Sequence, residues 1–537
     1  MKISTAAQIV FRAAFCVALA GCSESKLPDP SSSQDAGVNG TVDAAADAPL
    51  AAQGRNVLLL IFDDIGAEEI RSYASDLAKI ARANPTSVGI KDTNSNRIPD
   101  GLEDTNNDGQ PDGAIATPAI DSLASAGVRF TQVWSHPTCS PTRAGIYTGR
   151  YVIHHGVGEP IGNPSTVWAL PHDVPTLPEI LKSEGSRYKT ALLGKWHLGS
   201  IDGTLPTDRG WDYFAGSTDG KIDDYYRWKK VVVDEARKRT NSVETAYATT
   251  VAIDEALGWI GKQSGPWWAT VALNAAHTPY AEPPASCLSG KISGTDDVAL
   301  FHKTFECADH EVARLLGGIE PAKLANTTIV FIGDNGTEGS ATEVYQNTRA
   351  KTQVYQGGVH VPMIVADGAL LAHTSGLGLG AVVNPGRTIT SPTHTVDIFA
   401  TIAAIMGSTK ALSTDSTSFV DTLGSSSAPA LRTMAYTDAI GYQAGDVTAL
   451  NKSLANPATL TLAQVLTLKR ATVRGAMRTA KYKLIYDSGS YKLFDLTNDP
   501  FEQASVWCTS AEAKTQGEQL ATALAALDTM YPATKCP

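Results

Sequence analysis

The sequence predicts an α/β fold, in which a large, mixed and mostly parallel sheet is flanked by helices and followed by a smaller C-terminal α+β subdomain. Apolar strands alternate with helical segments over residues 55–412, a pattern typical of a doubly wound sheet. Each predicted strand ends in polar residues, where open α/β sheets place their ligand sites. Near the C-terminus, over residues 413–537, the pattern changes and includes a hairpin, which indicates the second, smaller subdomain.

Four apolar runs predict the central strands. They cover residues 56–62, 190–193, 268–273 and 327–332. Continuous runs rich in branched residues are expected where a strand is buried on both faces. Because the carboxyl ends of parallel strands meet at one edge of a sheet, the polar residues after these four strands should assemble a single site.

Helices are predicted where apolar residues recur every three or four positions. These segments are 118–126, 177–183, 244–260, 301–316 and 395–406. Two short segments, 482–486 and 491–496, flank a Ser-Gly turn and predict the C-terminal hairpin.

The N-terminus resembles an export signal. Lys2 and Arg12 precede the apolar run 13–20, which is too short to span a bilayer as a permanent helix. The run ends in Leu-Ala-Gly-Cys, which resembles the lipobox of bacterial lipoproteins. That resemblance implies removal of residues 1–21 and lipidation of Cys22, with a lipid anchor to the outer membrane. The alternative is an ordinary cleaved signal peptide in which Cys22 has no role.

The charge balance argues against a nucleic-acid partner. The chain has 44 Lys and Arg against 55 Asp and Glu, a net charge of −11, and no clustered basic segment that could neutralise phosphates. Residues 22–54 are rich in Ser, Asp, Ala and Pro and predict a flexible tether. No further apolar run of about 18 residues follows, so we expect a body held at a membrane surface by its anchor.

Residues 136–150 carry the most informative motif, HPTCSPTRAGIYTGR. Its segment Cys139-Ser140-Pro141-Thr142-Arg143 resembles the signature of type I, formylglycine-dependent sulfatases, the arylsulfatase-like branch of the alkaline phosphatase superfamily. Further matches follow in the family's order over about residues 54–505: Asp63-Asp64, Gly194-Lys195-Trp196-His197, Arg209-Gly210-Trp211-Asp212, His277-Thr278-Pro279, Gly333-Asp334-Asn335-Gly336, Lys351 before Tyr355-Gln356-Gly357-Gly358, and Asn498-Asp499-Pro500-Phe501-Glu502.

The chemistry of these residues supports the resemblance independently. Asp63, Asp64, Asp334 and Asn335 are oxygen ligands at two strand ends, a set that suits Ca²⁺ or Mg²⁺ better than Zn²⁺, with calcium the stronger expectation. A sulfate ester carries a delocalised negative charge, so its cleavage needs cations around the nonbridging oxygens. The candidates for that task are Arg143, Lys195 and Lys351.

The resemblance implies a role for each remaining site residue. A formylglycine-generating enzyme would oxidise Cys139, and the hydrated aldehyde would be both metal ligand and nucleophile toward sulfur. Asp334 would take the proton of that nucleophile. His277 and Lys351 would lie near the leaving oxygen, and His197 would deprotonate the second hydroxyl so that sulfate is expelled.

Two positions depart from the family pattern, and two other functions stay open. Gln356 stands where Glu is usual and His360 where Arg is usual, which leaves the environment of the sulfated small molecule or sugar open. One alternative is a formylglycine-dependent phosphodiester or phosphonate hydrolase on the same scaffold. A more remote one is a calcium-dependent surface-binding protein with a vestigial enzyme domain.

An acidic insertion at about residues 67–116 resembles calcium-binding repeats of the EF-hand and thrombospondin type 3 kinds. It predicts a structural calcium site, the alternative being a solvated acidic loop. The segment reads as two successive loops: in the first, Arg97 stands where the turn prefers Gly, and in the second, Ile115 stands where the closing acid should be. The candidate ligands are Asp92, Asn94, Asn96, Asp100, Glu103, Asp104, Asn106, Asp108 and Asp112.

The seven cysteines divide by expected fate. Cys16 leaves with the signal, Cys22 would be lipidated and Cys139 would be oxidised. Four remain, and neighbours in sequence suggest two disulfides in an exported protein, Cys287 with Cys307 and Cys508 with Cys536, although other pairings are open.

Overall fold

The computed structural model describes residues 54–537 except 86–89, 108–109, 373–381, 383, 409, 411–413, 533 and 535–537. The predicted signal 1–21, Cys22 and nearly all of the predicted tether lie outside the described residues, as do Asp108 and Cys536. Within the described part of the chain, no helix combines the length and apolar character needed to cross a membrane.

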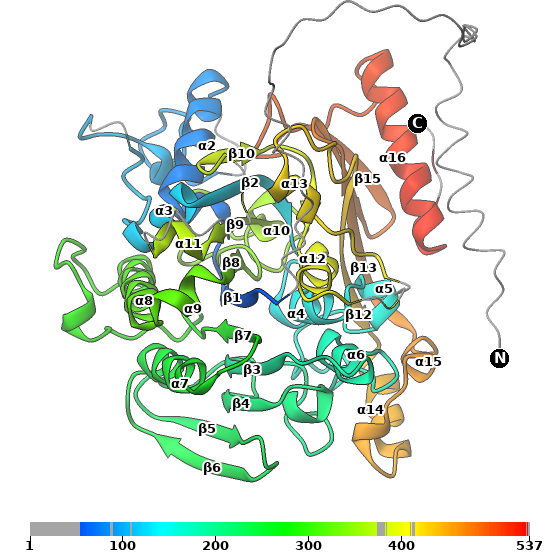
Figure 1. Ribbon diagram of the computed structural model, residues 1–537. Coiled ribbons are helices and arrows are strands. Elements are labelled where there is room, and N and C mark those ends of the chain that lie inside the picture. Colours follow the sequence, from blue (N-terminus) through cyan, green and yellow to red (C-terminus); the bar gives the residue numbers. More distant parts are fainter. Residues whose placement is uncertain are drawn as a thin grey trace, which may run out of the picture. The chain divides into compact units, whose positions relative to one another are not determined.

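The larger sheet of the described chain has eleven strands in the order β10-β2-β9-β8-β1-β7-β3-β4-β5-β6, with β11 beside β2 (Figure 1). Its centre is parallel, because β1 pairs in parallel with both β7 and β8, whereas β9, β5 and β6 pair antiparallel. The strands are β1 (Asn56–Phe62), β2 (Gly127–Trp134), β3 (Lys189–Gly194), β4 (Tyr213–Gly216), β5 (Trp228–Val233), β6 (Arg239–Glu244), β7 (Trp267–Ala272), β8 (Thr327–Gly333), β9 (His360–Asp367), β10 (Arg387–Ile389) and β11 (Thr393–His394).

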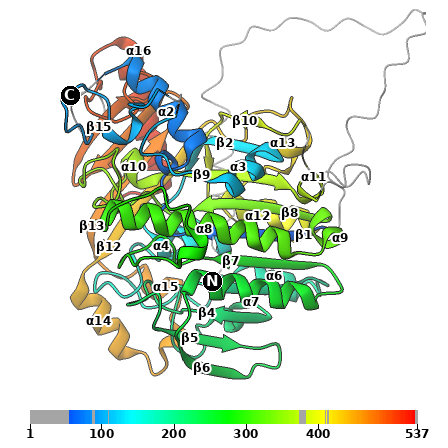
Figure 2. The ribbon, with the colours of Figure 1, turned by 90° about the vertical axis from the view of Figure 1, so that its left-hand side faces the viewer.

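Helices cover both faces of this sheet. The side chains of β1 alternate between two apolar cores: Val57 packs with residues of α4, α6 and α12, and Leu58 with residues of α3, α7 and α8. Figure 2 shows α7 and α8 lying across the second face. The helices of this part are α2 (Arg71–Ala83), α3 (Pro118–Ser125), α4 (Cys139–Thr148), α5 (Val152–His155), α6 (Leu177–Ser183), α7 (Ala248–Lys262), α8 (Asp297–Gly318), α9 (Pro321–Ala325), α10 (Gln356–Val359), α11 (Gly368–Leu371), α12 (Asp397–Ile405) and α13 (Val420–Gly424), with short 3-10 turns at Ala67–Glu69, Asp100–Leu102, Pro206–Arg209 and Ala285–Cys287.

The C-terminal subdomain is a four-stranded antiparallel sheet in the order β12-β13-β14-β15. Leu520 and Leu524 of its long helix belong to the apolar core that also covers the first face of the large sheet. The elements are β12 (Ala435–Tyr442), α14 (Ala444–Ser453), a 3-10 turn (Pro457–Thr459), α15 (Leu462–Val465), β13 (Arg470–Arg478), β14 (Tyr482–Asp487), β15 (Ser490–Asp495) and α16 (Ala511–Leu527). The predicted fold class, including the C-terminal hairpin, is confirmed.

Helix boundaries differ from the prediction in places, and α8 begins at Asp297 rather than at residue 301. The expected helix 244–260 begins at Ala248, because Glu244 ends the strand β6. Nearly every residue of β6 is exposed, so this edge strand lacks the alternation of buried and exposed side chains that would have marked it.

The predicted disulfide between Cys287 and Cys307 is present and joins the turn at Ala285–Cys287 to α8. Cys508 is also disulfide-bonded. Cys139 is a free, buried cysteine.

Candidate active site

The polar residues after four adjacent strands meet at one edge of the large sheet. Asp63 and Asp64 follow β1, Asp334 and Asn335 follow β8, and Lys195 follows β3. His277 lies in the loop after β7. The strand order β8-β1-β7-β3 makes these ends neighbours, as parallel pairing requires.

The chain bends sharply at Asp64, and the side chains of both Asp63 and Asp64 therefore point into the site. Successive side chains of a strand point to opposite faces, but Asp64 has a φ of 59°, in the left-handed region that non-glycine residues rarely adopt. The backbone N–H of Asp64 donates to Oδ1 of Asp334 over 3.1 Å. The neighbouring strand therefore holds this turn.

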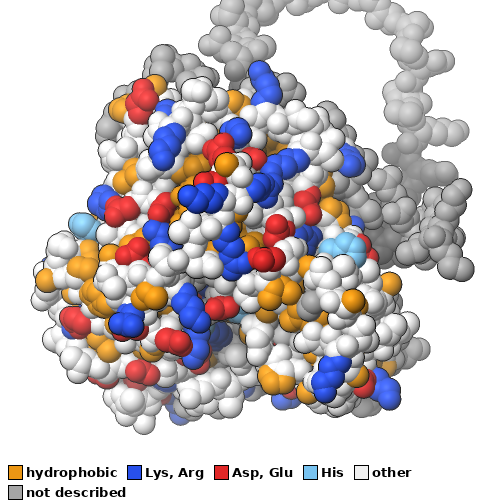
Figure 3. Space-filling model, turned by 90° about the horizontal axis from the view of Figure 1, so that it is seen from below, with side chains coloured by type: hydrophobic (Ala, Val, Ile, Leu, Met, Phe, Trp, Pro, Cys, Tyr) orange, Lys and Arg blue, Asp and Glu red, His pale blue; other side chains and the backbone are white. Residues whose placement is uncertain are grey.

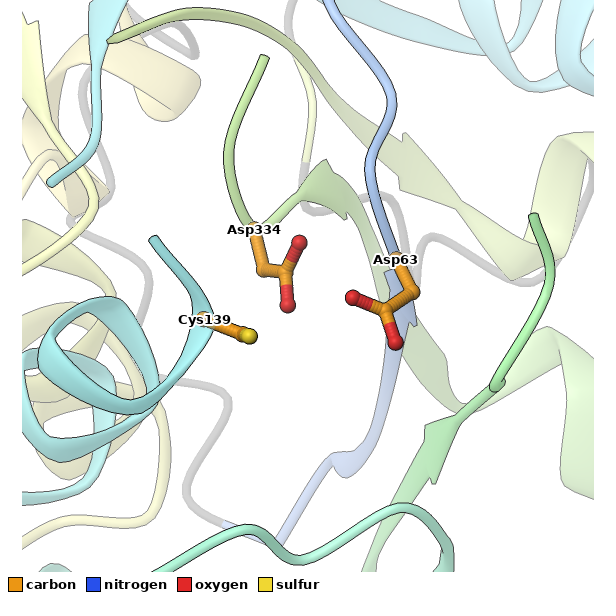
Figure 4. Close-up of side chains that lie close together, drawn as sticks. All are labelled: Asp63, Cys139 and Asp334. Atoms are coloured by element: carbon orange, nitrogen blue, oxygen red, sulfur yellow. The ribbon is translucent and has the colours of Figure 1, made fainter. Parts of the chain in front are cut away.

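Helix α4 brings Cys139 to the same point. Cys139 is the first residue of α4, is 2% exposed, and its Sγ lies within 4.8 Å of carboxylate oxygens of Asp63 and Asp334. Figure 4 shows the three side chains pointing toward one another. Burial raises the pKa of the thiol, and the nearby carboxylates add to this effect, so an unmodified Cys139 is a poor thiolate.

Arg143 lies one turn further along α4 and connects three elements of the site. Its Nε and Nη2 donate to Oδ2 of Asp334 over 3.0 and 2.8 Å, and its Nη1 donates to the carbonyl of Lys195 over 3.0 Å. The guanidinium is fully buried. The C-x-P-x-R spacing therefore places a fixed cation directly behind the cysteine.

Both lysines of the site pair with carboxylates. Lys195 Nζ lies 2.5 Å from Oδ2 of Asp63, and Lys351 Nζ lies 2.7 Å from Oδ2 of Asp64. Burial opposes ionisation of Asp64, but Lys351 and the neighbouring His277 and Lys195 outweigh it and hold the pKa of Asp64 below its usual range. The formal charges balance, because three buried acids face three buried cations: Asp63, Asp64, Asp334, Arg143, Lys195 and Lys351.

His197 is held by a closed ring of three hydrogen bonds. Its Nε2 donates to the carbonyl of Ile161 over 2.9 Å, the N–H of Ile161 donates to Oγ of Ser140, and that hydroxyl donates to the carbonyl of His197. Because a carbonyl can only accept, Nε2 carries the proton, and Nδ1 is left as a buried acceptor without a partner among the described residues. Burial and Lys195 hold the pKa of His197 well below 6.5.

Ser140 and Ile161 were not predicted as residues that support His197. Ser140 stands beside Cys139 in the motif and could have been found there. Ile161 acts through its backbone, and no residue-type signal marks such a contact.

His277 presents its Nε2 to the site. Its Nδ1 donates to the carbonyl of Thr278 over 2.6 Å, and Nε2 lies 3.9 Å from Oδ2 of Asp64. Burial, opposed by Asp64 and assisted by both lysines, lowers the pKa of His277 to about 4. The hydroxyl of Tyr225, which the sequence analysis did not single out, donates to the carbonyls of Asn274 and His277 and fixes this loop.

The residues present fit a divalent cation. In the part of the chain that the structure describes, Oδ1 of Asp63 and Oδ1 of Asn335 are buried oxygens without a hydrogen-bond partner, although buried polar atoms normally have one. The amide of Asn335 is oriented by donation from its Nδ2 to Oδ1 of Asp64 over 2.8 Å, which leaves its oxygen free. Hard oxygen donors of this kind suit Ca²⁺ or Mg²⁺.

In the acidic insertion, candidate ligands from the two ends of the first loop meet, because Oε1 of Glu103 accepts hydrogen bonds from the side-chain amides of Asn94 and Asn96 over 2.7 and 2.6 Å. Asp92 accepts hydrogen bonds from the backbone N–H groups of Asn96 and Arg97, and Asp100 accepts from Thr93. Arg97 has a φ of 70°, which explains why glycine is preferred at this position. Within the described residues, the only group of three or more His, Cys, Asp or Glu ligand atoms is that of Asp63, Cys139 and Asp334.

The two departures from the family pattern lie beside Trp134. Oε1 of Gln356 accepts from the indole N–H of Trp134 over 2.9 Å, and Nε2 of His360 donates to the carbonyl of Thr131. Both side chains are 7% exposed. Figure 3 shows one face of the molecule, on which acidic and basic side chains are interspersed.

Comparisons with known proteins agree with this geometry. The family model described as Sulfatase matches residues 55–408. Arylsulfatase J of Mus musculus is 42% identical over 116 residues, 21% of this chain and 19% of that protein, and arylsulfatase H of Canis lupus familiaris is 25% identical over 385 residues, 55% of this chain and 65% of that protein. Each match thus spans less than two thirds of the relative.

A solved structure shares the fold. The crystal structure of Ps i-CgsB in complex with k-i-k-neocarrahexaose has a TM-score of 0.61 and 21% identity, covering 88% of this chain and 92% of that chain. This likeness concerns the fold alone, whereas the family match covers the strand ends and α4 described above. The chain belongs to the sulfatase family.

Proposed function

We propose that this protein is a sulfatase that hydrolyses a sulfate ester through a formylglycine formed from Cys139, with Ca²⁺ as the preferred metal. The observation that carries the proposal is the position of Cys139. Its sulfur lies within 4.8 Å of the carboxylates of Asp63 and Asp334, in a buried centre that also holds three fixed cations.

Asp63, Asp64, Asp334 and Asn335 would hold the metal, together with the modified Cys139. When present, the metal supplies electrophilic activation and the hydrated aldehyde supplies an oxygen nucleophile. Because the protein's own acids and bases balance in the centre, a bound divalent cation makes the site positive, and a negatively charged sulfate group then has a net attraction to it.

The side chains divide the remaining work. Arg143 is fixed by its three hydrogen bonds and supplies positive charge beside residue 139. Lys195 and Lys351 are positioned to exchange part of their carboxylate contacts for the nonbridging oxygens of sulfate. His197 offers the unprotonated Nδ1 as a base. His277 presents Nε2 and can donate a proton to a leaving oxygen once an anion nearby favours its protonated form.

The cellular setting and substrate are part of the proposal. The lipobox-like N-terminus supports export and lipid anchoring at Cys22 in the outer membrane. The disulfide Cys287–Cys307 supports an oxidising compartment. A sulfated sugar is a suitable substrate class, because BT4656, a protein of the same fold, was solved in complex with its substrate D-glucosamine-2-N,6-O-disulfate.

The test combines mass and activity. The protein is produced together with a formylglycine-generating enzyme, and the mass of the peptide containing Cys139 is measured by mass spectrometry. Conversion of Cys139 to the aldehyde is expected. Turnover is then compared between an aryl sulfate and an aryl phosphodiester, with Cys139→Ala as the control. Unconverted Cys139 in active enzyme would remove the mechanism. Faster cleavage of the phosphodiester would favour the alternative hydrolase.

A further inference from the structure

A second cleft lies away from the catalytic centre, between the edge of the large sheet and the C-terminal subdomain. It has a volume of about 390 Å³ and is lined by residues of α2 and α10, of β2 and β9, of the segment around β10, and of β13 and the loop after β15. Its walls include the apolar side chains Leu77, Ile80, Leu496 and Pro500. No residue assigned above to catalysis lines it.

Arg478 is the central charged group of this cleft. The residue is 3% exposed, yet it forms no ion pair with a carboxylate of the described residues. Its Nε donates to the carbonyl of Thr479, and its Nη2 donates to Oε1 of Gln132 and the carbonyl of Ala480. These bonds use two of its three nitrogens, so Nη1 is left without a hydrogen bond to the described residues.

The carboxylate that acts on Arg478 already pairs with other groups. Glu502 is the carboxylate that acts on Arg478, but its Oε1 lies 2.6 Å from Nζ of Lys483 and its Oε2 accepts from the N–H of Gln356. Lys483 and Arg478 both lie over the ring of Trp134, at 4.6 and 5.6 Å. Two buried cations therefore share one carboxylate, which leaves one positive charge without a carboxylate partner within the described part of the chain.

Two amide groups beside Arg478 are fixed as donors. An indole N–H can only donate, so Gln356 must turn its oxygen to Trp134; a guanidinium can only donate, so Gln132 must turn its oxygen to Arg478. Both glutamines line the cleft, and neither NH₂ group has a hydrogen-bond partner among the described residues. The one acidic lining residue, Asp76, is paired with Arg129 and Lys79.

We propose that this cleft is a second ligand site, which binds the sulfate or carboxylate group of a sugar-sized molecule through Arg478, Gln132 and Gln356. The oxyanion accepts from Nη1 of Arg478 and from the two amides, and the body of the ligand rests against the apolar wall. Gln356 is neutral and lines the same cleft, so it adds no carboxylate that would compete with a bound anion for Arg478. The inference does not depend on the proposed catalysis.

Calorimetric titration of the whole protein tests the site. The probes are glucose 6-sulfate and glucuronate, with glucose as the uncharged control. Binding of at least one anionic probe is expected in the parent protein and in Lys351→Ala, which weakens the catalytic centre. Gln356→Glu should weaken that binding about tenfold or more, because the new carboxylate competes for Arg478 while still accepting from Trp134.

Two further variants make the result decisive. Arg478→Met should lose binding to the same extent, whereas Arg474→Met, four residues earlier on β13 and outside the cleft, should not. Gln356→Glu needs little rearrangement, so it carries the test if Arg478→Met fails to fold. Unchanged affinity in Gln356→Glu, loss of all binding in Lys351→Ala, or no binding of either anionic probe to the parent protein would each overturn the proposal.

Discussion

Replacing Ser140 by Ala should separate the orientation of His197 from the binding of substrate. The hydroxyl of Ser140 donates to the carbonyl of His197 and accepts from the N–H of Ile161, each over 2.9 Å. These two bonds close the ring that places the proton of His197 on Nε2. Alanine opens the ring while preserving the cysteine, proline and arginine of the motif.

The size of the effect follows from the two partners left behind. The carbonyl of His197 and the N–H of Ile161 lose their partner in a buried setting, and each such loss costs about 1–3 kcal/mol. The free energy of unfolding should therefore fall by about 2–6 kcal/mol. A positioned base contributes about 10²- to 10⁴-fold to a rate, so a loosened His197 should lower kcat by about 10- to 100-fold. KM should change little, because Ser140 supports His197 rather than the sulfate.

The assay is steady-state hydrolysis of an aryl sulfate, corrected for the fraction of Cys139 converted in each preparation, with urea unfolding measured in parallel. Ser140→Thr keeps a hydroxyl and should recover most of kcat. Ser122→Ala removes a hydroxyl that bonds only within α3 and should leave kcat unchanged. If Ser140→Ala raised KM without lowering kcat, or if threonine failed to restore the rate in a folded protein, the proposed orientation of His197 would be wrong.

Four other outcomes are expected. Burial raises the pKa of Asp309 from 3.8 to about 6, so between these pH values the native state binds more protons than the unfolded state. The free energy of unfolding should therefore fall by about 3 kcal/mol as the pH rises through that window. Thermal unfolding measured against pH should show this fall, and Asp309→Asn should abolish it. Replacing Cys287 and Cys307 together by Ser opens a loop of 20 residues and should cost about 3 kcal/mol in urea unfolding; equal midpoints for both proteins would contradict this. Removal of divalent cations by a chelator should abolish sulfatase activity, and added Ca²⁺ should restore it, because Oδ1 of Asp63 and Oδ1 of Asn335 are positioned to bind a cation. Full activity in protein shown to be metal-free would refute the metal site. Calcium titration of the whole protein should reveal a further site in the acidic insertion that Asp92→Asn weakens, and identical heats from both proteins would leave the insertion as a solvated loop.

The sequence was a good guide to the strands that are buried on both faces and a poor one to the rest of the sheet. The run 56–62 coincides with β1 because every residue there is buried. Among the strands that were not predicted are β6, whose exposure removes the hydrophobic pattern, and β9, which enters the sheet antiparallel between β2 and β8.

Some contacts of the active site could likewise be predicted from the sequence, and others could not. Strand-end reasoning placed Asp63 and Asp334 together, since parallel order dictates that outcome. It did not show that Lys195 would pair with Asp63 or that His197 would depend on Ile161, because those contacts arise from the packing of loops far apart in sequence. Gln356 was noted as unusual, but only its bond to Trp134 reveals why its amide faces a cleft.

The complete burial of α4 determines when Cys139 can be modified relative to folding. All ten residues from Cys139 to Thr148 are buried, so no second protein can bind this segment once the chain has folded. Any enzyme that oxidises Cys139 must therefore act on the nascent or unfolded chain, and its opportunity closes when the helix packs beneath the sheet edge. Slower folding should raise the converted fraction, and protein refolded without that enzyme should stay inactive however much of the enzyme is added afterwards.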